Sequence, residues 1–451
     1  MNTKTTRRAC LKAGLGLAAA ATAGYFGVRH MGGGNAREKE HILLVVADAL
    51  RGDIVGKVVN GREVTPNVNM LAREGVMFSN AYSASPFTKI SMASIMSGMY
   101  PPGHGVESHF FSLPDCPTIS RHLSTQGYYC VGLVTNPYML GELGPGYSTK
   151  AMDFGFNPGF AYYRGVDPEG KDAPGGNSDP LSQYADGAML NEFLKREVLG
   201  IRVPAFAEDA PLFLYLHYMD THQPWIRPVV TTRTGQFHNG QADAAEVQAA
   251  DRELISRAVL EIEYDKKNLS EADIERLKAI YYEAAARFDD YFGEVLAELS
   301  RMGILADTTV IFTSDHGDEL MEHGTIGHNQ NLFSTALKVP LVIKSKRYTP
   351  RVVGARISNA MIFPTVAEMI GGVRLAHTQL ESLSPYIERE DLGDMTVFAS
   401  FYKRDRVILG DGRSAMDYDE PGGEGQKTET LFFNVDKDAD EKEPLRQTTA
   451  Q

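Results

Sequence analysis

Cysteine is scarce in this sequence, which has three such residues, Cys10, Cys116 and Cys130, in a chain of 451. So few thiols exclude a disulfide-rich scaffold, and no pair of them has the spacing of a structural zinc site. Cys116 and Cys130 could form one disulfide in an oxidising compartment, but the sequence alone leaves that pairing open.

Positive charge is also in short supply, because 45 Lys and Arg residues face 58 Asp and Glu residues, for a net charge of -13. A nucleic-acid surface needs a basic footprint, so we expect no nucleic-acid partner. The same charge argues against broad adhesion to an anionic membrane. The hydrophobic content of 43% is normal for a globular protein, and the length suits one large domain with a smaller unit.

The N-terminus has the features of a targeting segment. In "TTRRACLKAGLGLAAAATAGYFGV" the pair Arg7 and Arg8 precedes an apolar run, which resembles a twin-arginine export signal. An uncleaved membrane anchor is the alternative, but the run is short for a spanning helix and contains a small-residue cleavage site, Ala-Thr-Ala. We therefore expect an export signal at residues 1–30, a linker at 31–40 and a periplasmic protein that contacts the membrane only if the signal is uncleaved.

Strand and helix signals alternate through the body of the chain, which predicts an α/β fold with a mostly parallel central sheet flanked by helices. Helices are expected at residues 65–78, with Thr65 as the cap, and at 283–299. Continuous apolar runs typical of strands buried on both faces are "HILLVV", "PLFLYLHY", "TTVIFT" and "VPLVIK". Beyond residue 349 short strand-like pieces mix with acidic turns. We expect a catalytic domain at 41–349 and a smaller α+β subdomain at 350–451.

Polar side chains stand where three of these strands end. In an open α/β sheet the carboxyl ends of the strands line the ligand crevice, so such side chains should meet at one edge. Each could instead form a turn or a cap, but three strand ends together with a hydroxyl at a helix start indicate a site. The residues concerned are Asp48, Asp220, His222, Asp315, His316 and the hydroxyl of Thr88.

The order of these blocks resembles the sulfatase branch of the alkaline phosphatase superfamily, from about His41 to Leu445. The blocks that carry the resemblance are "ILLVVADALRGD", "TPNVNMLAREGVMFSNAYSASP", "YLHYMDTHQPW", "VIFTSDHGDELMEHGTIGH", "PTVAEMIGG" and "LFFNVDKDADEKEPL". The resemblance implies a metal-dependent hydrolase of small anionic esters.

One block departs from the family pattern. Typical sulfatases carry Cys-x-Pro-x-Arg, whose cysteine becomes formylglycine, whereas this chain has Thr88, Ile90 and Met92 at those positions. Threonine is the nucleophile in phosphate-ester hydrolases and phosphotransferases of the wider superfamily. The resemblance therefore implies a Thr88 nucleophile and a covalent phosphothreonine, activated by a divalent cation and by the start of a helix. A plain helix cap is the alternative for Thr88.

The resemblance also implies the remaining site residues. Asp48, Thr88, Asp315 and His316 would bind one divalent ion, which could be calcium, manganese or zinc. A second metal could use Asp220, His222 and His328, although we favour one. His222 would protonate the leaving group.

His328 and Asn136 would contact the phosphoryl group, unless they serve only as a buried histidine and a turn former. Lys89 could supply the missing positive charge or be merely solvated. A sulfatase in the strict sense, or a non-catalytic binding protein on the same scaffold, remain the alternative functions.

Overall fold

The computed structural model describes residues 40–108, 110–139, 154–166, 187–206, 210–225, 233, 235–238, 244–260, 269–328, 331–371, 378–389, 391–402, 404–418 and 429–445. The expected export signal and nearly all of the expected linker lie outside these residues, so both stay predictions. Within the described residues no helix has the length and hydrophobicity needed to cross a membrane.

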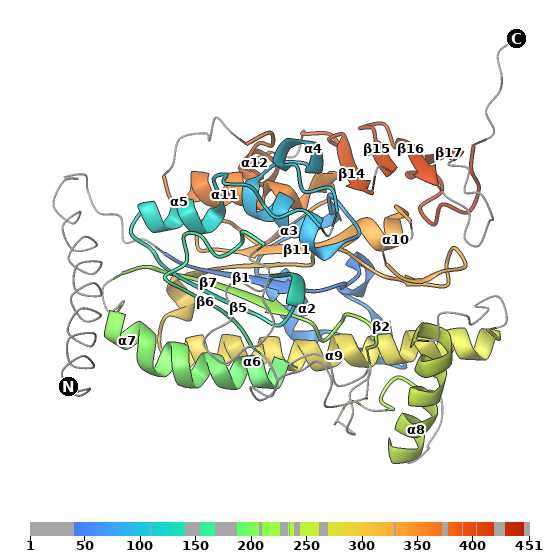
Figure 1. Cartoon of the computed structure of the whole chain (residues 1–451), viewed down its shortest axis with the longest axis horizontal. Coiled ribbons are helices and arrows are strands. Elements are labelled where there is room, and N and C mark those ends of the chain that lie inside the picture. The colour runs from blue at the N-terminus through green and yellow to red at the C-terminus, as the bar shows by residue number, and fades with distance from the viewer. Residues whose placement is uncertain are drawn as a thin grey trace, which may run out of the picture. The chain divides into compact units, whose positions relative to one another are not determined.

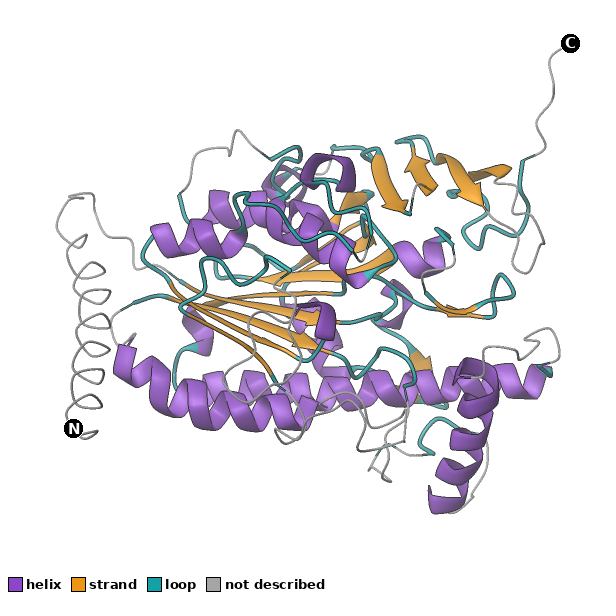
Figure 2. Cartoon of the chain, viewed as in Figure 1, coloured by secondary structure: helices purple, strands orange, loops and turns teal. Residues whose placement is uncertain are grey.

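A nine-stranded mixed sheet forms the centre of the fold, in the order β12-β4-β11-β8-β1-β7-β5-β6, with β13 paired to β4 (Figures 1 and 2). Its strands are β1 (His41–Ala47), β4 (Val76–Tyr82), β5 (Tyr129–Val134), β6 (Tyr162–Gly165), β7 (Leu212–Tyr218), β8 (Thr308–Thr313), β11 (Lys338–Lys344), β12 (Arg351–Val353) and β13 (Ile357–Ser358). Strand β11 runs antiparallel to both β8 and β4, and the other pairings are parallel. The mostly parallel α/β fold expected from the sequence is confirmed.

Helices cover both faces of the sheet because its central strands are apolar on both sides. Along β1, Ile42 and Leu44 pack into one hydrophobic core while Leu43 and Val45 pack into the other, as the period of two requires. Figure 1 shows α3, α5 and α11 on one face and α6 and α9 on the other. Their bounds are α3 (Thr88–Ser97), α5 (Ile119–Thr125), α6 (Gly187–Phe193), α9 (Glu271–Arg301) and α11 (Ile362–Met369).

Two expected helices have different bounds in the structure. The helix expected at 65–78 is α2 (Pro66–Glu74); the chain turns at Gly75 and enters β4, so the last residues of that expectation are strand. The other helix, α9, begins at Glu271, twelve residues before the expected start, and its N-cap Ser270 forms a capping box with Asp273. Both errors arise because apolar periodicity marks the packed face of a helix better than its ends.

The region after residue 349 contributes to two different sheets. Strands β12 and β13 extend the large sheet beside β4, and α11 packs on α3. A separate antiparallel sheet follows, with strands β14 (Val397–Phe401), β15 (Arg404–Ile408), β16 (Arg413–Tyr418) and β17 (Glu429–Asn434). The smaller subdomain expected at 350–451 thus shares its first strands with the main sheet. Cys116 and Cys130 are both free thiols.

Short elements connect these layers. They are η1 (Gly52–Ile54), β2 (Val58–Val59), β3 (Arg62–Glu63), α4 (Pro101–His104), η2 (Pro137–Met139), η4 (Leu194–Arg202), α7 (Val203–Phe206), α8 (Ala244–Ile255), η5 (Ser256–Leu260), η7 (Leu305–Asp307), β9 (Glu319–Leu320), β10 (Ile326–Gly327), α10 (Ser334–Leu337), η8 (Asn359–Met361) and α12 (Ser384–Glu388).

Candidate active site

The carboxyl ends of parallel strands bring the expected site residues to one edge of the sheet. Strands β5, β7, β1 and β8 are parallel neighbours, and each ends near a site residue: Asn136, His217, Asp48 and Asp315 in that order. Strand β4 points the same way, because β11 is antiparallel to both β4 and β8, and it leads into α3. Segments far apart in sequence therefore meet where the open-sheet rule predicts a ligand crevice.

Thr88 is the first residue of α3, and its hydroxyl lies at the centre of the group. Its Oγ1 is 3.4 Å from Asp48 Oδ2, 3.3 Å from His316 Nε2 and 3.4 Å from Asn136 Nδ2. The cap position itself is held by Phe87, which makes no side-chain cap hydrogen bond. The hydroxyl thus faces charged and polar side chains, beside the helix end whose N–H groups favour an anion.

Asp48 is fully buried and receives hydrogen bonds from several elements. Its Oδ2 lies 2.5 Å from Asn136 Nδ2 and 3.0 Å from His217 Nε2, while Tyr215 contacts the other ring nitrogen of His217 at 2.7 Å. Burial alone would raise the pKa of Asp48, but the nearby His222, His217 and His316 outweigh it and hold that pKa below its usual range. Asp48 is therefore an ionised carboxylate inside the protein.

Two buried carboxylate oxygens lie close to Nε2 of His316. Asp48 Oδ1 and Asp315 Oδ2 have no hydrogen-bond partner within the described part of the chain, and they lie 3.8 and 3.4 Å from His316 Nε2. The opposite nitrogen, Nδ1, lies 3.0 Å from the Gly317 carbonyl, so that nitrogen carries the proton and Nε2 offers a lone pair. Two carboxylates and one imidazole lone pair converging in this way fit a divalent cation.

Asp318 and His328 form a second group beside the first. His328 Nδ1 is 2.7 Å from Asp318 Oδ1, and the Trp225 indole donates to Asp318 Oδ2 at 3.0 Å. Burial raises the pKa of Asp318 to about 7, whereas burial and the neighbouring His316 and His222 hold the pKa of His328 well below its usual value. His316, Asp318 and His328 offer ligand atoms within 4.8 Å of one another.

His222 reaches this second group, whereas Asp220 faces away from it. The rings of His222 and His328 have centroids 4.7 Å apart, and His222 Nδ1 lies 2.7 Å from the Gln223 carbonyl oxygen. Asp220 Oδ1 instead lies 3.9 Å from Arg287 Nε, and Asp220 belongs to none of the metal-ligand groups found in the described residues. The structure therefore brings the expected catalytic and metal residues together, without Asp220.

Two further polar residues near the motifs, His104 and Lys89, are buried against other parts of the fold. His104 hydrogen-bonds Ser94 at 2.9 Å, and burial lowers its pKa to about 3. Lys89 is buried, with Nζ 3.6 Å from the centre of the Phe154 ring, and burial lowers its pKa to about 8. The alternative that Lys89 is merely solvated is therefore wrong.

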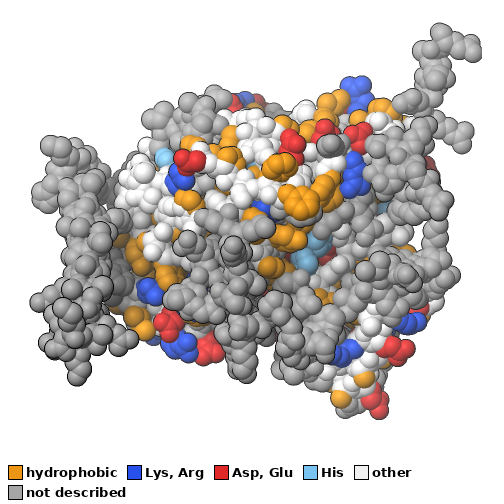
Figure 3. Space-filling view, in the orientation of Figure 1, with side chains coloured by type: hydrophobic (Ala, Val, Ile, Leu, Met, Phe, Trp, Pro, Cys, Tyr) orange, Lys and Arg blue, Asp and Glu red, His pale blue; other side chains and the backbone are white. Residues whose placement is uncertain are grey.

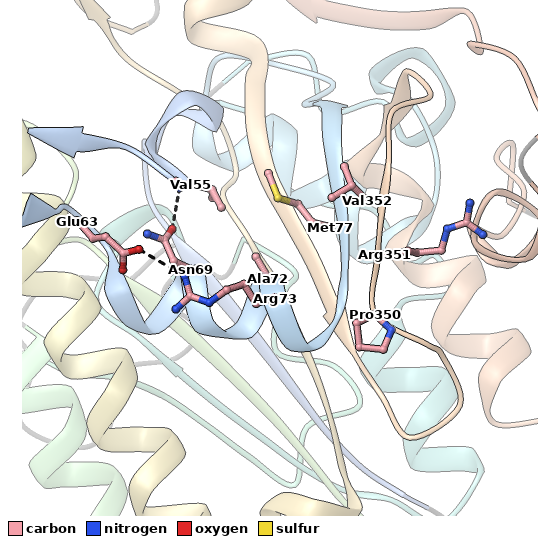
Figure 4. Close-up of a pocket in the computed structure, with 10 residues that line it drawn as sticks. Val55, Glu63, Asn69, Ala72, Arg73, Met77, Pro350, Arg351 and Val352 are labelled. Atoms are coloured by element: carbon pink, nitrogen blue, oxygen red, sulfur yellow. Dashed lines mark hydrogen bonds and ion pairs between the residues drawn. The ribbon is translucent and has the colours of Figure 1, made fainter.

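A pocket of about 360 Å³ lies elsewhere in the fold, between η1, α2 and the start of β12 (Figure 4). Asn69 accepts a hydrogen bond from the backbone of Gly56 beside it, and Arg73 pairs with Glu63. None of the residues that line this pocket belongs to the group around Thr88. We therefore assign the pocket no part in the chemistry of that group.

Comparison with known proteins agrees with this arrangement. The family model described as Sulfatase matches residues 40–373, which is most of the chain. The chain belongs to the sulfatase family. Its fold and its ester-hydrolase class follow from that membership, and metal dependence is typical of sulfatases.

Relatives of this sulfatase-family chain carry names from the wider superfamily and from sulfatases. It is 24% identical over 409 residues to the multifunctional alkaline phosphatase superfamily protein PehA of Trinickia caryophylli, covering 77% of each chain. It is also 24% identical over 377 residues to the choline-sulfatase of Rhizobium meliloti, covering 79% of this chain and 71% of that one.

A solved structure shares the fold of this sulfatase-family protein. It is the phosphonate monoester hydrolase of Agrobacterium radiobacter, with a TM-score of 0.67, 22% identity, and coverage of 89% of this chain and 90% of that one. At that identity the similarity supports the fold alone.

Two residues of this sulfatase-family site were not expected from the sequence. His217 lies inside the apolar run of β7, and Asp318 lies two positions after His316. Asp48, His217 and Asp315 form a group of their own, with ligand atoms within 4.8 Å of one another. His217 is the one histidine of β7, near its carboxyl end, and the strand has no Asp or Glu. A fully buried histidine needs a polar partner, and that need was the signal for a site residue here.

Proposed function

We propose that this chain hydrolyses phosphate or phosphonate esters, with Thr88 as the nucleophile. One observation carries the proposal: a buried threonine hydroxyl at the start of α3 lies 3.3–3.4 Å from Asp48, His316 and Asn136. The family resemblance puts the formylglycine-forming cysteine at this position, and the chain has threonine there instead. A threonine hydroxyl can attack phosphorus directly, whereas it cannot form the aldehyde that a formylglycine enzyme uses.

The reaction takes place in two balanced steps. Thr88 Oγ1 attacks the phosphorus, the bond to the leaving oxygen breaks, and His222 gives that oxygen a proton. Water then attacks the phosphothreonine and gives a proton to His222, the bond from phosphorus to Thr88 Oγ1 breaks, and the proton taken up by Asp48 returns to Oγ1 as phosphate or phosphonate is released. An alcohol in place of water would make the same chain a phosphotransferase.

The surrounding side chains prepare Thr88 for this attack. Asp48 can accept the hydroxyl proton across 3.4 Å, and Asn136 holds the Asp48 carboxylate in place through its 2.5 Å hydrogen bond. A divalent ion held by Asp48, Asp315 and His316 with Thr88 would lower the pKa of the attacking hydroxyl and neutralise substrate charge. Because Asp48 and Asp315 each keep a buried oxygen with no hydrogen-bond partner in the described part of the chain, the residues present fit such an ion.

A sulfatase in the strict sense is the second candidate. It is favoured by the similarity to the choline-sulfatase, which matches this chain at the same 24% identity as the multifunctional phosphatase-superfamily relative. Sulfate and phosphate esters share a tetrahedral anionic centre, so the carboxylate and histidine groups alone do not distinguish them. The nucleophile distinguishes the two candidates, because the formylglycine route of sulfatases needs a cysteine, and position 88 is a threonine.

The test is to trap the intermediate on Thr88. We expect rapid quenching with 4-nitrophenyl phosphate, or with an aryl phosphonate, to give a phosphoryl adduct that maps to Thr88 in the intact-mass and peptide spectra. Thr88→Ala should form no adduct and lose several orders of magnitude in turnover. Thr88→Ser keeps a hydroxyl and should keep measurable activity.

A matched control separates chemistry from helix stability. Ser94→Ala removes a hydroxyl from the same helix, where Ser94 contacts His104 rather than the site. It should keep the Thr88 adduct. Full activity of Thr88→Ala would rule out the proposed nucleophile, and faster turnover of 4-nitrophenyl sulfate than of the phosphate and phosphonate would favour the sulfatase alternative.

A further inference from the structure

A third group of metal-ligand side chains lies away from the Thr88 site. His238 follows the turn at residues 235–237, Asp251 lies on α8 and Glu283 lies on α9; Figure 1 shows α8 beside α9. His238 Nε2 is 3.5 Å from Asp251 Oδ2 and 3.4 Å from Glu283 Oε1. All three ligand atoms lie within 4.8 Å of one another.

The two carboxylates of this group are buried, and two of its ligand atoms make no hydrogen bond within the described residues. Asp251 is 1% exposed and Glu283 is 6% exposed. Within the described residues Glu283 Oε1 and His238 Nε2 have no hydrogen-bond partner, although they face each other across 3.4 Å. A buried carboxylate oxygen and a buried imidazole nitrogen are costly to leave unpaired, so their convergence on one point needs an explanation.

Surrounding residues hold the two carboxylates in place. Arg276 donates to Asp251 Oδ1 at 2.5 Å, which leaves Oδ2 directed at His238. Burial and the nearby Asp251 raise the pKa of Glu283 to about 8, although backbone N–H groups of the turn bind its carboxylate. Asp251 and Glu283 are thus each held from outside the group, and one oxygen of each lies close to His238.

We propose that His238, Asp251 and Glu283 bind a divalent transition-metal ion, for which Zn²⁺ is the probe, at a site separate from the catalytic one. One imidazole and two carboxylates suit zinc or manganese better than the all-oxygen shells of calcium or magnesium. A neutral imidazole with two carboxylates balances the charge of a divalent ion. Three protein ligands leave one tetrahedral position for water.

Such an ion would join the turn to both helices. Glu283 and Arg287 are one helical turn apart on α9, and Arg287 donates to the Trp225 carbonyl at 2.8 Å. The Trp225 indole in turn donates to Asp318 of the active site. The bound ion would stabilise the fold around the segment that follows His222, because metal binding to the native state adds to the free energy of unfolding.

The test measures zinc bound by the full chain after metal removal and dialysis against Zn²⁺. His238→Ala and Glu283→Gln should each bind one equivalent less than the parent, and should lose part of the rise in melting temperature that zinc produces. His41→Ala is the matched control, because His41 only accepts a hydrogen bond from the Leu212 backbone and belongs to none of the three groups. It should bind as much zinc as the parent.

Unchanged zinc content in both site variants, or an equal loss in His41→Ala, would overturn the proposal. Cobalt supplies a second readout in the Asp315→Asn chain, which lacks one ligand of the proposed catalytic ion. Visible absorption bands from bound Co²⁺ should persist there and disappear when His238→Ala is added. If either site variant fails to fold, the Asp315→Asn variant alone still tests the site. Absence of both bound zinc and cobalt absorption bands in that variant would refute the proposed site.

Discussion

Asp48 is the residue at which the separate parts of the active site converge. Its carboxylate contacts Asn136 after β5, His217 on β7 and Thr88 on α3, and its backbone carbonyl accepts from Thr221 at 2.5 Å. A single buried carboxylate with this many partners fixes the positions of several strand ends at once. The hydroxyl of Thr88 is therefore placed by the sheet as much as by its own helix.

The role of His222 can be tested by varying the leaving group. His222→Ala should lower turnover of an alkyl phosphate by about 10²–10⁴-fold, because an alkoxide leaves poorly without a proton. Turnover of 4-nitrophenyl phosphate should fall far less, since nitrophenolate needs little protonation. Steady-state kinetics with both substrates measure the ratio. Equal losses would mean that His222 does not act as the general acid.

From the sequence, single site residues were expected where they follow apolar strands. Asp48, Asp315 and His316 were expected from the ends of their strands, and the structure brings them together with Thr88. His217 could not be found in that way, because its own strand continues past it to Tyr218 and the run reads as apolar. Only the parallel register beside β1 shows that His217 lies next to the end of that strand.

At the scale of elements, α2 is capped by a residue from another helix. The expected cap, Thr65, makes no side-chain cap hydrogen bond. Asp289 of α9 instead accepts from the backbone N–H groups of Asn67 and Val68, at 2.9 and 2.8 Å. The start of α2 thus depends on a carboxylate more than two hundred residues away in sequence, and no local pattern could reveal it.

Removing this carboxylate should destabilise the protein more than removing the expected cap. Asp289→Ala leaves the N–H groups of Asn67 and Val68, part-buried and buried respectively, without this acceptor and should lower the free energy of unfolding by about 3 kcal/mol. The measurement is urea denaturation at pH 8, above the value of about 6 to which burial raises the pKa of Asp289. At that pH the carboxylate is ionised in the parent.

Thr65→Val is the matched control for the cap. It removes the expected capping hydroxyl, which is buried without a hydrogen-bond partner in the described residues. It should change the free energy of unfolding by less than about 0.5 kcal/mol. If Thr65→Val lowered the free energy of unfolding more than Asp289→Ala did, Thr65 would be the cap of α2 and the capping by Asp289 would be wrong.

At the scale of the whole molecule, the site exists only after the chain has folded. Its residues come from positions as far apart as 48 and 328, and the sheet brings them together. On the face shown in Figure 3, basic side chains are scattered among acidic ones, in keeping with the net charge of -13. That face offers no broadly positive surface, so for the proposed anionic ester the groups at the strand ends and the start of α3 supply the local contacts.

Folding before export would let the chain acquire its metal in the cytoplasm, and the paired arginines of the N-terminal segment suit that order of events. A twin-arginine signal is recognised by a receptor, so its function depends on the arginines themselves and not on their charge or on hydrophobicity. Arg7→Lys together with Arg8→Lys preserves the charge and the apolar run. We expect the double variant to accumulate as uncleaved precursor in the cytoplasm, as cell fractionation with immunoblotting would show. Export of the double variant at the parent level would assign the segment to the general secretory route or to a membrane anchor, and the ion would then have to bind after translocation.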